Sequence, residues 1–250
     1  MVSNYLFGLI GKGISHSFSA DYFNSKFQNL PLDARYVPFD IQRIDNFIEI
    51  ISDHPNLVGL NVTSPYKREI IPFLHELSAE SKILNAVNTI ELRKDENGNR
   101  ILKGHNTDSY GFQKTLKGII PEGIQALIMG TGGASSAVAL ALEKEGIPYL
   151  TVSRKPQGNQ IGYEEMNTLL KNFKLLINAT PLGMHPNINE VPDIDFENIG
   201  TNHICYDLIY NPSTTLFLQK AAAKGAKTYN GLQMLLNQAE LAWGIWKNYL

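Results

Sequence analysis

The sequence predicts an α/β protein made of two successive units in which strands and helices alternate. Short apolar runs of strand length recur along all 250 residues. Between many of them lie segments whose apolar residues repeat at helical spacing, and the connecting loops are short. A glycine-rich turn in the second half joins one such strand to one such helix. This alternation favours parallel sheets covered by helices on both faces.

The first half contains three strands, two helices and a hairpin. Residues 5–10 stop at a glycine pair, as a buried strand would, and further strands are expected over 34–39 and 57–62. A helix begins near Ser19, and the isoleucines and Phe47 between positions 41 and 51 predict an amphipathic helix. Residues 87–93 and 101–103 flank a turn-rich stretch and predict the hairpin.

The second half repeats the alternation more regularly. Strands are expected over 124–129, 149–152, 175–179 and 204–208. Three helices are expected. The first follows the glycine turn and ends at Gly146, the second spans 213–224 with Gly225 after its last turn, and the third spans 232–246. The best boundary between the halves is near residues 106–108, where a helix follows the hairpin.

Composition excludes several functions. The 22 basic and 24 acidic residues give a net charge of −2, which offers no electrostatic footprint for nucleic acid or an anionic membrane. Cys205 is the single cysteine, so neither an internal disulfide framework nor a multi-cysteine zinc site is expected. Without a signal peptide or a transmembrane stretch, the chain is expected to be a cytoplasmic protein that needs no metal.

The glycine-rich turn predicts a nucleotide site. Residues 130–135 read GTGGAS at the end of a strand, where glycines let the backbone approach a pyrophosphate and the helix N-terminus attracts negative charge. Ser135 occupies the third glycine position of the usual pattern. A tight turn without a ligand is the alternative interpretation, but the surrounding strand–helix–strand context favours a site.

The next strand ends in cations instead of an acid. NAD-binding proteins usually place a carboxylate there for the ribose hydroxyls, yet no acidic residue occurs between Glu145 and Glu164. Arg154 and Lys155 would suit a 2′-phosphate, which favours NADP. A solvated basic turn remains the alternative.

Polar residues also follow the strands of the first half. Ser17 and Ser19 flank Phe18, Asn61 and Thr63 precede Lys67 where a helix is expected to begin at Pro65, and further amides, hydroxyls and one carboxylate occur at 88–89 and 106–108. Each has an ordinary structural explanation, such as a helix cap or a solvated lysine. Together they suggest a site for a small polar molecule.

At these positions the sequence resembles the shikimate dehydrogenases. The motifs occur in the family's order over nearly the whole chain: ISHSFS (14–19), NVTSPYK (61–67), AVNT (86–89), GHNTD (104–108), GTGGAS (130–135), INATPLGM (177–184), YDLIYNP (206–212) and NGLQMLLNQA (230–239).

The resemblance implies NADP-dependent, reversible reduction of 3-dehydroshikimate to shikimate, a step towards chorismate and the aromatic amino acids. It implies a substrate-binding domain over 1–107 and a Rossmann-type NADP-binding domain over 108–230, with the C-terminal helix, residues 231–250, returning to the first domain. It implies a small-molecule substrate, no nucleic-acid or membrane partner, and a monomer or homodimer.

The resemblance also assigns roles to residues. Lys67 would be the acid/base group, with Asp108 fixing it. Ser17, Ser19 and Tyr210 would hold the substrate carboxylate. The ring hydroxyls would be bound by Thr63, Asn88, Asp108 and Gln238, with Asn61 nearby. The NADP site would comprise Gly130, Thr131, Gly132, Gly133, Ala134, Ser153, Arg154, Lys155, Leu208 and Gly231.

Three residues depart from the family pattern without removing an assigned one. They are Ala20, Ser109 and Ser136, the last standing where a basic residue often follows the glycine turn. Two alternatives stay open: a quinate/shikimate dehydrogenase that uses NAD, and a non-catalytic relative that binds NADP or shikimate. The basic pair argues against the first, and the presence of both Lys67 and Asp108 argues against the second.

Overall fold

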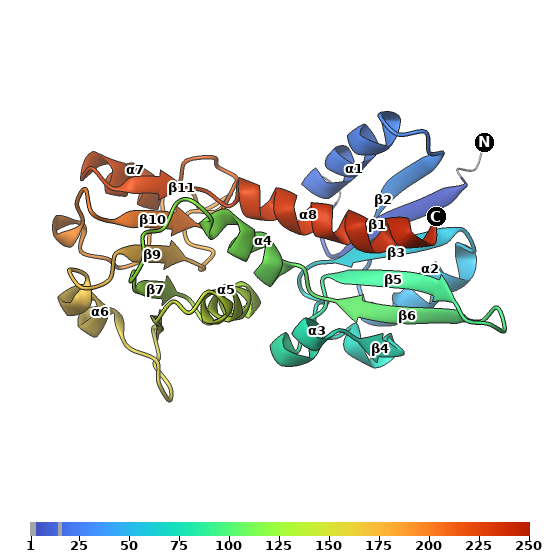
Figure 1. Ribbon diagram of the computed structural model, residues 1–250, viewed down its shortest axis with the longest axis horizontal. Coiled ribbons are helices and arrows are strands. Elements are labelled where there is room, and N and C mark those ends of the chain that lie inside the picture. Colours follow the sequence, from blue (N-terminus) through green and yellow to red (C-terminus); the bar gives the residue numbers. More distant parts are fainter. Residues whose placement is uncertain (1–3, 15–16) are drawn as a thin grey trace. The chain divides into compact units, whose positions relative to one another are not determined.

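The computed structural model describes residues 4–14 and 17–250, so Ser15 and His16 of the first polar motif lie outside the described residues. The chain divides into two compact units (Figure 1). The first comprises the described residues up to Thr107 together with Ala239–Leu250, and the second comprises Asp108–Gln238.

The first unit is a sheet with helices and short 3₁₀ turns. Its elements are β1 (Tyr5–Gly11), α1 (Phe18–Gln28), β2 (Ala34–Asp40), η1 (Ile44–Asn46), α2 (Phe47–Asp53), β3 (Leu57–Val62), η2 (Ile71–Phe73), β4 (Glu76–Leu77), α3 (Ala79–Leu84), β5 (Thr89–Lys94) and β6 (Arg100–His105). The strand order is β2-β1-β3-β5-β6-β4.

This sheet is mixed, whereas the alternation of strands and helices predicted a parallel one. β1 pairs with β2 and β3 in parallel, but β3 and β6 each pair with β5 antiparallel. The reason is the predicted hairpin, which is present: one Asp95 oxygen accepts from the backbone amides of Asn97 and Asn99, closing a tight turn between β5 and β6.

The C-terminal part of the chain completes the core of the first unit. Trp246 is fully buried among the aromatic residues Phe7 and Phe23, and its indole nitrogen donates to the Ile90 carbonyl at 3.0 Å. A Cβ on Gly59 of β3 would lie 2.4 Å from the Trp246 ring, so the glycine leaves the room that the indole occupies.

The second unit contains α4 (Asp108–Leu116), β7 (Ala126–Met129), α5 (Gly133–Lys144), β8 (Tyr149–Val152), α6 (Tyr163–Leu169), β9 (Leu175–Asn178), η3 (Phe196–Asn198), β10 (Ile204–Asp207), α7 (Leu216–Ala223) and β11 (Lys227–Tyr229). The last helix is α8 (Leu232–Trp246), followed by η4 (Lys247–Tyr249).

All pairings in the second sheet are parallel, with the order β11-β10-β9-β7-β8. β8 therefore lies at an edge. Ile161 forms a single bridge to it, accepting from the Ser153 amide and donating to the Thr151 carbonyl. Helices alternate with these strands, as the sequence predicted.

Two expectations about elements need correction. The helix expected over 41–51 begins only at Phe47, because the Ile41 amide bonds to Gly11 and continues the strand. No α-helix opens at Pro65, since residues 64–70 form turns and the Lys67 carbonyl accepts from Val87, not from the next helical turn. Near the end of the second unit, the side chain of Asn237 donates to the Gly111 carbonyl of α4 at 3.1 Å.

Within the described ranges, no helix is long and apolar enough to cross a membrane. Nor do three or more His, Cys, Asp or Glu residues gather there as a metal site would require.

Candidate dinucleotide and substrate sites

The glycine turn after β7 is shaped for close approach by a ligand. Gly130 has φ +117°, and a Cβ there would lie 3.0 Å from the Ala179 carbonyl oxygen. Gly132 is the N-cap of α5, and a Cβ on it or on Gly133 would meet no atom within 4 Å. The backbone at the start of α5, where the first amides of a helix lack intrahelical partners, is thus open to close approach on the Cβ side of both glycines. Ser135 is buried, and its hydroxyl donates to the Gly130 carbonyl at 2.6 Å, so this departure from the glycine pattern tightens the turn.

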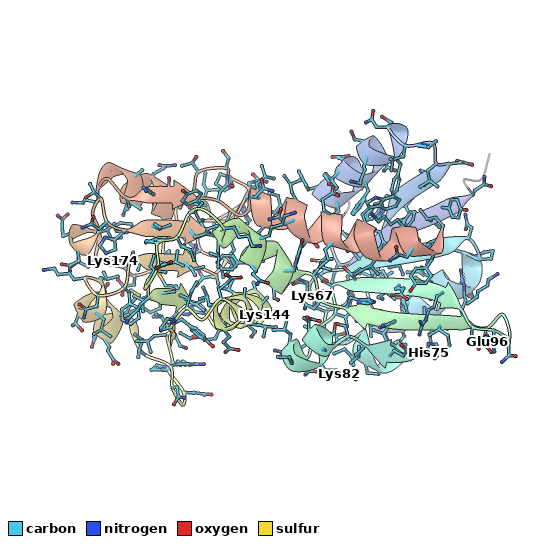
Figure 2. All side chains as sticks on the ribbon, viewed as in Figure 1. Lys67, His75, Lys82, Glu96, Lys144 and Lys174 are labelled. Atoms are coloured by element: carbon cyan, nitrogen blue, oxygen red, sulfur yellow. The ribbon has the colours of Figure 1, made fainter. Side chains whose placement is uncertain are left out.

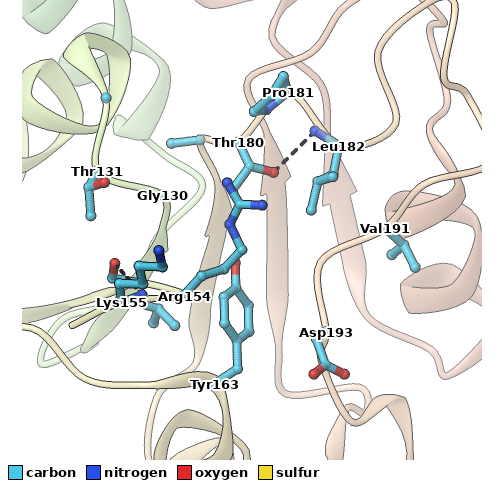
Figure 3. A pocket seen from close by; sticks show the side chains of 14 residues that line it. Gly130, Thr131, Arg154, Lys155, Tyr163, Thr180, Pro181, Leu182, Val191 and Asp193 are labelled. Carbon is cyan, nitrogen blue, oxygen red and sulfur yellow. Dashed lines mark hydrogen bonds between the residues drawn. The ribbon is translucent and has the colours of Figure 1, made fainter.

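Beside this turn lies a cavity of about 870 Å³ inside the second unit (Figure 3). Its size is typical of sites for small molecules and cofactors. It is lined by residues of the strand ends and the loops that follow them: Gly130, Thr131, Gly132, Val152, Ser153, Arg154, Lys155, Tyr163, Ala179, Thr180, Pro181, Leu182, Val191 and Asp193.

The lining includes six of the residues assigned to the cofactor. Of those assigned, Gly130, Thr131, Gly132, Ser153, Arg154 and Lys155 border the cavity. Among the described residues, Gly133, Ala134, Leu208 and Gly231 do not. Gly231 instead lies against the Leu208 backbone, where a Cβ would come within 1.9 Å of the Leu208 carbonyl oxygen.

Arg154 and Lys155 give the cavity a positive wall. Both are exposed, and neither side chain forms a hydrogen bond or ion pair with any described residue. The Ser153 hydroxyl accepts from the Lys155 amide at 3.1 Å, which fixes the backbone of the loop. Two cations on the wall of a cavity, neither bonded to a side chain or backbone group of the described residues, fit an anionic ligand such as a phosphate.

Tyr163, Thr180 and Asp193 line the same cavity, although the sequence assigned a role to none of them. Burial raises the pKa of the Tyr163 hydroxyl, with Arg154 opposing the rise and Asp193 adding to it. Thr180 belongs to the NATPLG stretch after β9, the only sequence signal that could have pointed to it.

A buried network of hydrogen bonds positions Thr180, one of the residues that line the cavity. The Asp207 carboxylate at the end of β10 is fully buried and accepts from Thr215 Oγ1 at 2.5 Å, from the Ile209 amide at 3.0 Å and from Asn178 Nδ2 at 3.1 Å. Asn178 Oδ1 accepts from the Thr180 hydroxyl at 2.6 Å. Burial raises the pKa of Asp207, and these hydrogen bonds oppose the rise.

In the first unit, Asn61 and Asn88 lie in one buried network. Asn61 Nδ2 donates to the Asn88 carbonyl and to Thr89 Oγ1, both at 3.1 Å, while its Oδ1 accepts from the Tyr36 hydroxyl at 2.8 Å. The Asn88 side chain bonds to Thr107 through both its oxygen and its nitrogen. Burial raises the pKa of Tyr36 well above its usual value, and a hydrogen bond involving Ser19 opposes the rise.

The remaining assigned residues of the first unit are half-buried. Ser17 caps α1, its hydroxyl accepting from the Ser19 amide at 3.2 Å. Thr63 follows β3, and its amide donates to the Ile10 carbonyl at 2.9 Å. Lys67 lies in the turns that follow. In Figure 2 it is labelled with the other side chains drawn as sticks.

The other three residues assigned to the substrate lie in the second unit. Asp108 is the first residue of α4. Tyr210 follows β10, is 39% exposed, and has a pKa raised by burial. Gln238 lies in α8, with its amide donating to the Leu235 carbonyl at 3.0 Å.

The second unit has the features of a Rossmann-type dinucleotide-binding domain: a parallel sheet, a glycine turn into a helix N-terminus and a charged cavity at the strand ends. Residues 9–90 of the first unit match the family model described as "Shikimate dehydrogenase substrate binding domain". A "Shikimate dehydrogenase (NADP(+))" of Desulforamulus reducens is 37% identical over 266 aligned positions, which cover 97% of this chain and 89% of the relative. The chain belongs to the shikimate dehydrogenase family.

Solved structures agree with this fold. Shikimate 5-dehydrogenase from Thermus thermophilus, in complex with NADP(H) and shikimate, is 30% identical with a TM-score of 0.85, covering 98% of this chain and 94% of that one. Quinate dehydrogenase from Corynebacterium glutamicum, in complex with NAD, is 25% identical with the same TM-score and the same coverage. The two-unit α/β architecture is thus shared by shikimate and quinate dehydrogenases.

Proposed function

We propose that this chain is an NADP-dependent shikimate dehydrogenase that reversibly reduces 3-dehydroshikimate to shikimate, on the route to chorismate and the aromatic amino acids. The observation that carries the cofactor assignment is the positive wall formed by Arg154 and Lys155. Relatives named for this activity, similar over nearly their whole length, support the substrate assignment.

The residues of the cavity fit a phosphorylated dinucleotide. The open space above Gly132 and Gly133 leaves the first amides of α5 available to a pyrophosphate. The cationic side chains of Arg154 and Lys155 suit the 2′-phosphate that distinguishes NADP from NAD. When bound, the nicotinamide accepts or supplies the hydride.

The protein must bind an anionic ring and move one proton. We assign the substrate carboxylate to Ser17, Ser19 and Tyr210, which offer neutral hydroxyl donors. Lys67 would give a proton to the carbonyl oxygen during reduction and take it back during oxidation. As an ammonium, it would also stabilise negative charge that develops on that oxygen in the transition state. Asp108 would orient Lys67 and accept from a ring hydroxyl.

The amides of the first unit would bind ring hydroxyls together with Thr63 and Gln238. Asn61 already donates twice and accepts once within the protein, so we assign it mainly to hold Asn88 and Thr89 in place. One lone pair of its Oδ1 remains for a substrate hydroxyl. Because Asn61 is buried and bonded on three sides, its position does not depend on the substrate.

Quinate dehydrogenase activity with NAD is the second candidate, favoured by the similarity to the Corynebacterium structure. Turnover should be measured with shikimate and quinate, each with NADP and NAD. We expect shikimate with NADP to be the best pair. Arg154→Asp should weaken NADP selectively, because it replaces a phosphate partner with a repelling charge. Equal efficiency with NADP and NAD in the unmodified protein would refute the cofactor assignment, and no turnover with any pair would indicate a non-catalytic relative.

The proton-transfer role is tested by Lys67→Met. Loss of an acid/base group should lower turnover about 10²-fold or more while shikimate still binds. Lys82→Met, at an exposed position of α3, is the matched control and should leave turnover unchanged. A folded Lys67→Met enzyme with wild-type turnover would show that another group transfers the proton.

A further inference from the structure

The dinucleotide cavity contains a negative charge in addition to its two cations. Asp193 lines the cavity, is exposed, and its carboxylate has no hydrogen bond or ion pair with any described residue. Arg154 lines the same cavity yet forms no ion pair with it, and Figure 3 shows their side chains set apart. Arg154 and Asp193 thus present opposite charges to the same cavity without neutralising each other.

The backbone around Asp193 is held in place. Its carbonyl accepts from Asn167 Nδ2 at 3.2 Å, and Asn167 Oδ1 accepts from the Asp195 amide at 2.8 Å. The next residue, Ile194, is buried in the core of the second unit. Asp193 is therefore presented to the cavity from an anchored segment, as a group that contacts a ligand should be.

The electrostatic surroundings of Tyr163 also indicate that both charges lie near the same cavity. Burial raises the pKa of its hydroxyl, Arg154 lowers that pKa and Asp193 raises it further. Both charges therefore act on this one cavity-lining side chain. The cavity thus has a cationic side and an anionic side, with the tyrosine near both.

The chemistry of a 2′-phosphorylated adenosine decides which group faces the carboxylate. A carboxylate only accepts hydrogen bonds and repels phosphate, so it must lie against a donor distant from the 2′-phosphate. The ribose 3′-hydroxyl is on the carbon next to the phosphate, which makes it a poor partner. The remaining donor of the adenosine half is the exocyclic amino group of adenine.

We propose that Asp193 accepts a hydrogen bond from the exocyclic amino group of the dinucleotide's adenine and thereby makes the site selective for that base. The proposal rests on the proposed function, because it requires that the cavity bind NADP. It adds to that function a residue that recognises the base, separate from the cations that recognise the phosphate.

The test compares NADP⁺ with deamino-NADP⁺, in which a carbonyl oxygen replaces the amino group. Binding of each to the whole protein is measured by calorimetry, so the result does not depend on turnover. The wild type should bind NADP⁺ about ten- to hundredfold more tightly, the effect of losing a hydrogen bond to a charged group. In Asp193→Asn this preference should fall to about threefold or less, because an amide can either accept from the amino group or donate to the oxygen.

Asp195→Asn is the matched control. It removes the same charge two residues away, outside the cavity lining, and an asparagine can still accept from the Glu197 amide that Asp195 caps. This variant should keep the wild-type preference between the two dinucleotides.

The outcomes separate the two proposals. If the wild type prefers NADP⁺ to NAD⁺ but binds deamino-NADP⁺ equally well, the role of Asp193 is refuted and the proposed function stands. A preference that Asp193→Asn retains in full would also refute it. If neither NADP⁺ nor NAD⁺ binds, both proposals fail.

Discussion

Removing the Asp207 carboxylate should destabilise the second unit and loosen the cavity wall. The two carboxylate oxygens accept from three donors, on Thr215, Ile209 and Asn178. Asp207→Ala leaves all three buried without this acceptor. Asp207→Asn keeps one oxygen for Ile209 and Asn178 and disturbs only the contact with Thr215.

The magnitudes follow from that count. A buried donor left without a partner costs about 1–3 kcal/mol, and partial relaxation reduces the sum for three of them. We therefore expect Asp207→Ala to lower the free energy of unfolding by about 3–5 kcal/mol. Asp207→Asn should lower it by about 1 kcal/mol, the value of one hydrogen bond. NADP should bind the alanine variant more weakly, because Asn178 also positions Thr180 in the lining.

The assay is urea unfolding followed by circular dichroism at several pH values. Burial raises the folded-state pKa of Asp207, so its contribution is fully present below the unfolded value of about 3.9 and is lost as pH rises through the folded value. The advantage of the wild type over Asp207→Asn should therefore shrink as pH rises from about 4. An Asp207→Ala protein within about 1 kcal/mol of the wild type would refute this account of the network.

Two further predictions use single side chains of the first unit. Ser17→Ala should raise the Michaelis constant for shikimate about tenfold, through loss of a donor worth about 1–3 kcal/mol to a desolvated anion. Ser78→Ala removes an equivalent helix cap, also at 3.2 Å, at a position outside the assigned site, so it measures only the stability cost of losing a cap, about 1 kcal/mol. If Ser17→Ala weakened NADP binding as much as shikimate binding, Ser17 would be a structural residue. Burial alone would raise the pKa of Glu91, but the hydrogen bond with His105 at 2.9 Å contributes to a net lowering. The stability that Glu91 contributes relative to Glu91→Gln is therefore present above its unfolded value of about 4.3 and should be lost as pH falls below about 4, and a pH-independent difference in urea midpoint would contradict it.

Local patterns in the sequence predicted the parts of the fold that local physics determines. Alternating apolar runs located β3 and α8 at their observed bounds, and the hairpin turn is set by Asp95 and its neighbours. The helix expected at Pro65 failed because a distant residue, Val87, bonds to the Lys67 carbonyl. No property of residues 64–70 themselves could have shown this competing partner.

The candidate site was predictable to the same extent. The glycine turn and the pair of cations after β8 are each a short contiguous stretch of sequence, so each could be identified and together they indicated a ligand. Tyr163, the first residue of α6, and Asp193, in the loop before η3, line the same cavity, and neither belongs to a chemical motif. The hydrogen bonds that Asn61 forms within the protein also depend on residues far away in the chain, such as Tyr36. These features exist only once the chain has folded.

The bridge between Ile161 and β8 has a consequence for protein engineering. An exposed strand edge invites pairing with another molecule, and Ile161 occupies the Thr151 carbonyl and the Ser153 amide on the outer edge of β8. The loop that carries Arg154 and Lys155 brings Ile161 to that position. Exchanging the whole loop to change cofactor preference would therefore uncover the edge and promote aggregation, whereas single substitutions within it leave the edge covered.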